Sequence, residues 1–309
     1  MSQPAISNMN ETELALLRHF VVSTATTLAD NPELLKVAQE ITPLLACGYP
    51  FLMDGILACS AFHIAHCDSG QKNMKNISLF YQNRGIQGFR EAMSYIAEDN
   101  CYALFMFSHI IITFAFTTHM EETLLSNRPL HEGIRGSFQY IRGTSLVTSS
   151  AWNLIENSPM KALITPKDKI PKLSGVTSDT LVKALLSAIP AHKDSENWNE
   201  RACEIYRECA MELGRAFRCC RPNDDGLNIW DAVWMWPLNI SEDYLDLLER
   251  GHPAALILLA QYCVLLVNVE FYWYIGEWGR KILKDIYQCL DETDRAWIQR
   301  PLAEVGMSL

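Results

Sequence analysis

One predicted helix carries four side chains that could bind a metal ion. They fall at offsets of zero, four, seven and eight along the chain, which places them on one helical stripe: Cys59, His63, His66 and Cys67. A tetrahedral site needs ligands from a second element, because one helix rarely presents three or four ligands to one ion. The spacing therefore favours packed thiols and hydrogen-bonded histidines, and we predict no metal site and no cofactor.

The remaining cysteines also lack the spacing of a zinc motif. The chain has ten cysteines and no C-x-x-C pair: Cys47, Cys59, Cys67, Cys101, Cys203, Cys209, Cys219, Cys220, Cys263 and Cys289. Neither a zinc finger nor a six-cysteine zinc cluster can be built from them. In a large intracellular chain they are expected to be free thiols packed like small apolar residues.

Catalytic motifs with a fixed signature are missing from the sequence. It has no G-x-S-x-G, no P-loop, no H-E-x-x-H and no G-x-G-x-x-G after a strand. The sequence therefore does not favour a hydrolase, a kinase, a zinc protease or a nicotinamide enzyme. Cyclisation, isomerisation and pericyclic reactions remain open, because an apolar pocket can hold a substrate in a reactive geometry without a nucleophile or cofactor.

Two histidines lie in a stretch that is otherwise strongly apolar. His109 and His119 fall within residues 100–120, among phenylalanines and aliphatic side chains. A histidine in such a helix must find a polar partner or lose solvation energy. The carbonyl or hydroxyl of a ligand could be that partner for His109, and plain core packing is the alternative.

Helical signals cover almost the whole chain, and strand alternation is nearly absent. Asn10 can cap a first helix with Glu13 three residues later, and Pro50 suits the first turn of another. We predict an all-α fold, a helical bundle, with further helices over 51–67, 77–96, 100–120, 130–154, 179–189, 198–217, 241–248, 253–275, 276–290 and 292–298.

We expect one all-α domain over residues 1–309. Prolines, lysines and small polar residues predict a mobile surface loop near 165–178, and a second break falls at 221–226. After that break, three tryptophans are expected to wedge a connection against the core: Trp230, Trp234 and Trp236. The apolar stretches 103–116 and 254–267 are shorter than the ~18 to 20 residues of a membrane span, so we predict buried helices.

Charge and the first residues restrict the partners. The net charge is −10 and no cluster of Lys and Arg is present, so direct binding to nucleic acid is not expected. The residues after Met1 have neither a positive segment nor an apolar segment, so a secretory signal is not expected. We predict a cytoplasmic protein.

Several segments, in order, resemble one known family. They are GYPFLMDGILACSAFHIAHC (48–67), YQNRGIQGFREAMSY (81–95), DNCYALFMFSHIIITFAF (99–116), the stretch 131–155, and the closing WPLNISEDYLDLLERGHPAALILLAQYCVLL, FYWYIGEWGRKIL and DRAWIQRP. Together they resemble the C-terminal ligand-responsive regulatory domain of fungal zinc-cluster transcription regulators, of the sterol-sensing type. The resemblance implies a helical bundle around a hydrophobic pocket for a small lipophilic molecule, and homodimers. The zinc cluster of that family is not found in this sequence.

The resemblance leaves three hypotheses for the function. Because Met1 lies close to the first helix and no cluster is present, the favoured interpretation is a stand-alone, cofactor-independent enzyme of fungal secondary metabolism. It would carry out a cyclisation, a pericyclic reaction or an isomerisation on a terpenoid, polyketide or sterol-like substrate. The alternatives are a sterol-like ligand-sensing domain of a transcription regulator, located in the nucleus, and a non-catalytic regulatory partner that dimerises with a full-length regulator.

The pocket hypothesis selects candidate site residues from two apolar helices and their ends. Five polar side chains are candidate catalytic residues, as hydrogen-bonding partners of substrate oxygens: His109, His119, Tyr262, Tyr272 and Trp273. The apolar, ligand-binding walls are expected from Met53, Leu57, Phe105, Met106, Phe116 and Trp278.

Overall fold

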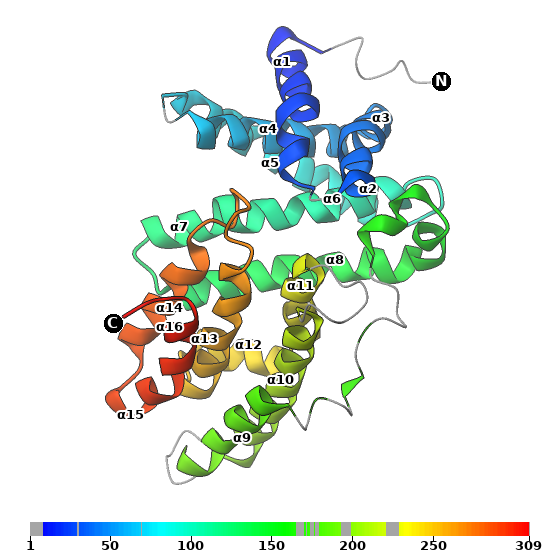
Figure 1. The fold of residues 1–309 in the computed structure, drawn as a ribbon. Helices are drawn as coiled ribbons and strands as arrows, with labels where there is room; N and C mark the ends of the chain where they lie inside the picture. The colour runs from blue at the N-terminus through cyan, green and yellow to red at the C-terminus, as the bar shows by residue number, and fades with distance from the viewer. Residues whose placement is uncertain are drawn as a thin grey trace. The chain divides into compact units, whose positions relative to one another are not determined.

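The fold is all-α, as predicted. The computed structural model describes residues 9–29, 31–68, 70–164, 170, 172–173, 176, 179–192, 199–220 and 229–308. Helices make up nearly all regular structure in these ranges, and none of the residues in them forms a strand (Figure 1).

Contacts within the chain divide it into two compact units. The first comprises Met1–Thr117, Gly143–Ile164 and Tyr272–Tyr274. The second comprises Thr118–Arg142, Thr165–Phe271 and Ile275–Leu309. The expectation of one domain over 1–309 stays a prediction.

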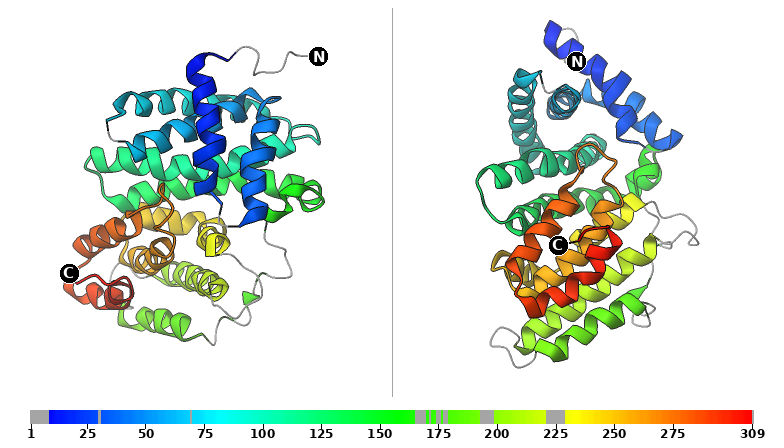
Figure 2. Two further views of the ribbon diagram at one scale, coloured as in Figure 1. Left: turned by 45° about the horizontal axis from the view of Figure 1, so that its top comes forward. Right: turned by 60° about the vertical axis from the view of Figure 1, so that its left-hand side comes forward.

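The first unit is built around helix α4, Pro50–Cys67. The other helices of this unit are α1 (Glu11–His19), α2 (Pro32–Lys36), α3 (Thr42–Ala46), α5 (Lys72–Met93) and α6 (Cys101–Phe114). Helix α1 and the π-helical turn Phe20–Thr24 that continues it cross α4, while α5 and α6 pack along it (Figure 2). The predicted capping box is confirmed, because Asn10 and Glu13 exchange hydrogen bonds at the start of α1.

Helix α4 has no solvent-exposed face along most of its length. Pro50 occupies the first turn, where its missing N–H has no partner to lose, and every residue from Phe51 to His63 is buried. A helix that is apolar on all sides belongs inside a larger core. Glycines allow the close packing, because a Cβ on Gly55 would lie 2.9 Å from the Phe107 ring of α6 and one on Gly85 of α5 would lie 3.0 Å from it.

The second unit is a bundle around helix α13, Pro253–Val267. Its other helices are α7 (Met120–Leu125), α9 (Thr180–His192), α10 (Glu200–Cys219), α11 (Ile229–Asn239), α12 (Glu242–Glu249), α14 (Trp278–Cys289), α15 (Glu292–Arg295) and α16 (Gln299–Glu304). Helix α13 packs against α14, α10 and α12, and α9 lies beside α10 (Figure 1). Helix α8 (Leu130–Glu156) contributes its first part to this unit and its last part to the other.

The largest difference from the predicted helices is the end of α13. The helix stops at Val267 instead of near residue 275, and turns follow up to Glu277. These turns bury Tyr272 and Tyr274, which are 6% and 4% exposed, in the first unit. The chain then reverses at Gly276, whose φ of +46° favours glycine. Burial of two aromatic side chains therefore outweighs continuation of the helix.

The tryptophan-rich segment forms a helix, α11, instead of an irregular connection. Trp236 is fully buried and its Nε1 donates a hydrogen bond to the Cys209 carbonyl of α10, at 2.9 Å. Trp234 is also buried, so both tryptophans pack into the core as predicted. The side chain of Trp230, most of the loop 165–178 and the break 221–226 lie outside the described residues.

Two apolar helical stretches satisfy the length and composition of a membrane span. They are Pro50–Cys67 and Cys101–Leu125, and a bent pair, α12 and α13, would make a third. Within the protein, 72% of the first stretch and 78% of the second is buried. Their burial agrees with the prediction of buried helices, whereas the length predicted for 103–116 was too short, because that helical stretch continues to Leu125.

Replacing Gly55 should test the close crossing of α4 and α6. We expect Gly55→Val to lower the free energy of unfolding by about 1–3 kcal/mol or more, because the new side chain overlaps the Phe107 ring. Gly143→Ala in α8 is the matched control. Its Cβ would meet nothing within 4 Å, so the change should stabilise the helix by up to about 1 kcal/mol. Urea denaturation measures both, and equal effects of the two substitutions would contradict the crossing.

Candidate functional site

Three polar side chains are buried on α4, and each is met by a neighbouring element. Asp54 lies near its beginning and pairs with Arg84 of α5. Arg84 Nε donates to Asp54 Oδ2 at 2.7 Å, and Nη2 makes a second, shorter bond to Oδ1. Burial raises the pKa of the Asp54 carboxyl, while the guanidinium opposes that rise. Ser60 donates to the Leu16 carbonyl of α1 at 2.7 Å.

The third polar side chain, His63, has the most unusual surroundings. Its Nδ1 lies 3.2 Å from His19 Nε2 and 3.1 Å from Thr24 Oγ1. The side chain is 7% exposed. Burial, followed by the nearby His19 and His66, lowers the pKa of His63 to about 4. The imidazole is therefore neutral at pH 7.

The contacts at Nδ1 fit two tautomers of His63, and in one of them Nδ1–H donates to Thr24 Oγ1 or to His19 Nε2. In the other, the single lone pair of an unprotonated Nδ1 accepts a hydrogen bond from the Thr24 hydroxyl or from His19 Nε2–H. The proton of the neutral ring then lies on Nε2. Both hydrogen-bond contacts of the His63 ring within the described residues are made by Nδ1, so in this tautomer the Nε2–H can be donated to a ligand oxygen.

An indole ring covers this end of α4. The ring centroid of Trp273 lies 5.3 Å from that of His63 and 5.6 Å from that of the exposed His66. Its Nε1 donates to Thr27 Oγ1 at 3.0 Å, which holds the ring against the turn after α1. Trp273 belongs to a segment of three residues, Tyr272–Tyr274, that packs in the first unit although the residues on either side of it belong to the second.

The arrangement is suited to binding more than to acid–base chemistry. A neutral imidazole supplies one hydrogen-bond donor, and an aromatic wall supplies apolar contact, which is the usual combination in a ligand site. A histidine with a pKa of about 4 is a weak base at pH 7. We name this group, composed of His19, Thr24, His63 and Trp273, the His63 cluster.

His109 has backbone partners of its own. Its Nδ1 lies 2.9 Å from the Phe105 carbonyl one turn earlier, and its ring stands edge-on to the Phe105 ring. Burial lowers its pKa, and hydrogen bonds to the carbonyls of Phe105 and Leu163 oppose that effect. The need for a partner is thus met within the protein, and a ligand contact of His109 stays a prediction.

Three of the other predicted residues lie in the second unit. His119 packs directly on Gly136 of α8, where an added Cβ would lie 2.2 Å from its Nε2. Tyr262 is fully buried, and its hydroxyl donates to the Val233 carbonyl at 3.0 Å. Trp278 lies under Lys281, whose Nζ is 4.9 Å from the ring centroid.

The remaining predicted residues lie in the first unit. Tyr272 flanks Trp273 in the covering segment. The predicted wall residues there are all buried: Met53, Leu57, Phe105, Met106 and Phe116. The predicted site residues therefore fall in both units, and of the polar ones only Trp273 belongs to the His63 cluster.

The surface hollows of the described residues include two of similar size. One, of about 650 Å³, lies between the start of α1 and α5, and the other, of about 660 Å³, lies at the ends of α10, α12 and α13. Both are open to solvent, and no predicted site residue lines either of them. The enclosed hydrophobic pocket implied by the resemblance stays a prediction.

Two members of the His63 cluster, His19 and Thr24, were not predicted from the sequence. It predicted hydrogen-bonded histidines in α4, and this is confirmed for His63. It did not associate His19 and Thr24 with them, because α1 is joined to α4 by a long connection and no spacing rule links the two helices. A polar side chain in a helix buried on all sides was the available signal, since such a group requires a partner.

Comparisons with known proteins agree with the predicted resemblance. No model of a known protein family matches the chain. It is 21% identical to a Zn(2)-C6 fungal-type transcription factor of Gibberella zeae over 322 aligned positions, covering 96% of the chain and 63% of that relative. It is 22% identical to another such factor of Aspergillus fumigatus, covering 81% of the chain and 66% of the relative. It is 24% identical to Sterol uptake control protein 2 of Saccharomyces cerevisiae, covering 51% of the chain and 17% of that protein.

These relatives confirm the resemblance to fungal transcription regulators over most of the chain. The chain spans less than two thirds of the length of each of them. They favour the alternative left open by the sequence, a regulatory domain, over the cofactor-free enzyme. The comparisons give no support to a cyclase, a pericyclase or a homodimer.

The lowered pKa of His63 predicts a pH dependence of stability. Because the folded pKa lies below the unfolded value of about 6.5, the neutral imidazole stabilises the fold above pH 6.5. That contribution is lost as the pH falls from 6.5 towards 4, by up to about 3 kcal/mol. His63→Gln should lose correspondingly less stability than the wild type over this range. The measurement is urea unfolding at a series of pH values.

The control for this pH dependence lies on the same helix. His66→Gln replaces an exposed histidine and should keep most of the wild-type loss. Parallel stability curves for the wild type and His63→Gln would contradict the assignment.

Proposed function

We propose that this chain acts as the ligand-responsive regulatory domain of a fungal transcription regulator. The observation that carries the proposal is the similarity to a Zn(2)-C6 fungal-type transcription factor across 96% of the chain. The role proposed for the chain is to sense a small molecule and not to contact DNA, in keeping with its net charge of −10. Nuclear localisation follows from this role.

The ligand proposed is lipophilic and carries a single polar group, as a sterol does. Similarity to Sterol uptake control protein 2 supports this class. The His63 cluster is the binding place that we propose, where His63 Nε2–H would donate to the ligand hydroxyl or carbonyl and the Trp273 ring would cover the apolar body of the ligand. The homodimer expected from the resemblance remains part of the proposal.

The position of Trp273 suggests how binding is transmitted. We expect a ligand that inserts beside His63 to move the indole away from Thr27, so that the hydrogen bond between them breaks while the ring packs on the ligand. The three-residue segment containing Trp273 lies within the turns that join α13 to α14, and the residues on both sides of it belong to the second unit. A ligand that binds only the state with the indole displaced increases the population of that state. The backbone then transmits the displacement of Trp273 to α13 and α14.

Sterol binding should depend on the His63 cluster. We expect ergosterol, delivered in cyclodextrin, to change the tryptophan fluorescence of the chain in a saturable way. His63→Leu removes the hydrogen bond to the ligand, and Trp273→Ala removes the aromatic wall. Each substitution should weaken the sterol affinity by about 5- to 15-fold. Trp152→Phe, which changes an indole bonded to Glu156 on its own helix, is the matched control and should bind like the wild type.

Unchanged affinity in both Trp273→Ala and His63→Leu would place the ligand elsewhere. Absence of saturable binding to the wild type would contradict the sterol-like class.

The regulatory role should be visible in a reporter assay. The chain fused to an unrelated DNA-binding domain should change reporter transcription in yeast when sterol synthesis is inhibited, because loss of ligand alters the state of the chain. The fusion with Trp273→Ala should respond weakly, and the fusion with Trp152→Phe should respond fully. Reporter activity that does not depend on sterol supply in any of the three fusions would contradict the proposal.

A further inference from the structure

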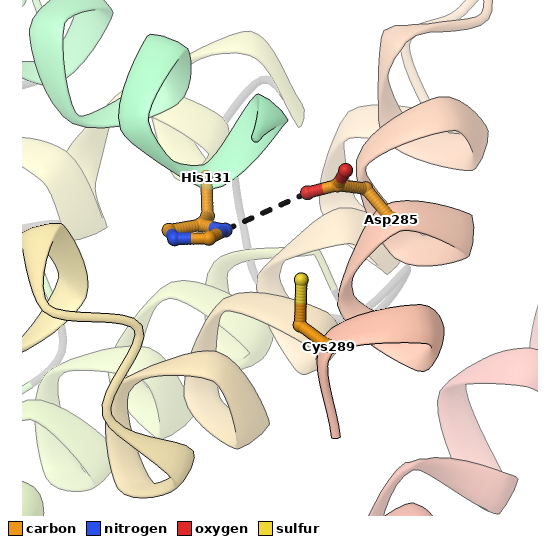
Figure 3. Close-up of side chains that lie close together, drawn as sticks. All are labelled: His131, Asp285 and Cys289. Carbon is orange, nitrogen blue, oxygen red and sulfur yellow. Dashed lines mark ion pairs between the residues drawn. The ribbon is translucent and has the colours of Figure 1, made fainter. Parts of the chain in front are cut away.

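A second group of polar side chains lies in the second unit and has no part in the His63 cluster. It consists of His131 in the first turn of α8 and of Asp285 and Cys289 on α14. Figure 3 shows the imidazole and the carboxylate facing each other, with the Cys289 sulfur close to both. In the described part of the chain, it is the one group of three His, Cys, Asp or Glu side chains whose ligand atoms all lie within 4.8 Å of one another.

His131 is buried without a complete set of partners. It is 5% exposed, and its Nδ1 makes no hydrogen bond although it is shielded from solvent. The nearest polar atom is Asp285 Oδ2 at 3.5 Å. A buried nitrogen without a hydrogen bond is unfavourable, so its position calls for a partner that lies between it and the carboxylate.

The spacing of the ligand atoms fits a small divalent ion. In a tetrahedral zinc site with bonds of about 2.0–2.1 Å, a nitrogen and an oxygen ligand lie about 3.3–3.4 Å apart. The observed 3.5 Å between His131 Nδ1 and Asp285 Oδ2 is close to that value. An imidazole, a carboxylate and a thiolate form a ligand set typical of zinc, whereas calcium and magnesium prefer oxygen ligands.

The elements around the group hold two of the side chains in place. Asp285 and Cys289 are four residues apart on α14 and so share one face of that helix. Asp285 Oδ2 also accepts a hydrogen bond from the Leu130 backbone N–H at 2.9 Å, which orients the carboxylate towards the first turn of α8. Such outer hydrogen bonds are what positions metal ligands in known sites.

We propose that His131, Asp285 and Cys289 form a zinc site that joins the start of α8 to α14. Nδ1, a carboxylate oxygen and Sγ are the three protein ligands. Cys289 is exposed, so the fourth position is filled by water or an external ligand. Binding releases the thiol proton to the solvent.

A simpler interpretation treats the group as a helix cap. Asp285 would then only cap the first turn of α8 and pair with His131, and Cys289 would have no role. Cys289 therefore distinguishes the two interpretations, because its sulfur contributes to the ion site and not to the cap.

The test is a metal titration of the chelator-treated chain. We expect Zn²⁺ to bind with one ion per chain in isothermal titration calorimetry, and Co²⁺ to give the near-ultraviolet charge-transfer band of a cobalt–thiolate bond. Cys289→Ser should abolish that band and weaken Zn²⁺ binding about tenfold or more. Cys289→His should regain Zn²⁺ binding without the band, because imidazole replaces the thiolate.

The matched control is Cys67→Ser, which removes another exposed thiol at the end of a helix, in the first unit. It should keep both the band and the affinity. Equal Zn²⁺ affinity of Cys289→Ser and the wild type, or loss of the band in Cys67→Ser, would overturn the proposal.

Discussion

The first unit depends on one constraint: α4 is buried on every side, yet it carries Asp54, Ser60 and His63. A buried polar group without a partner destabilises a fold by about 1–3 kcal/mol, so each of these side chains fixes a neighbour. Asp54 fixes α5 through Arg84, and Ser60 fixes α1 through the Leu16 carbonyl. His63 fixes the end of α1. The apolar contacts hold the helices together, and the polar contacts determine which helices meet and in what register.

The same constraint produces the candidate ligand site. His19 and Thr24 both approach Nδ1 of His63, and in the tautomer proposed for ligand binding the proton of the neutral ring lies on Nε2. The Trp273 ring lies 5.3 Å from the His63 ring, centroid to centroid, and donates one hydrogen bond to Thr27. The structural requirement of the helix and the proposed sensing of a ligand thus use opposite nitrogens of one imidazole.

Sequence alone predicted the features that depend on local patterns. The all-α fold, the capping box at Asn10, the start of α4 at Pro50 and the burial of Trp236 all follow from propensity and hydrophobicity. The features that were not predicted depend on contacts between residues that are distant in the chain. The early end of α13 reflects burial of Tyr272 and Tyr274 in the other unit, and the His19–His63 and His131–Asp285 contacts join segments with no common pattern. For His109 the partner is local: a ligand was considered as its hydrogen-bond partner, and the Phe105 carbonyl one turn earlier accepts the hydrogen bond.

The most direct test of this account is nitrogen NMR of the His63 imidazole at pH 7, with and without ergosterol. The account predicts a neutral ring protonated on Nε2, whose Nε2 resonance shifts when the sterol is added while the Nδ1 resonance changes little. A ring protonated on Nδ1, or an Nε2 resonance that does not change at saturating sterol, would contradict the assignment of this nitrogen to the ligand.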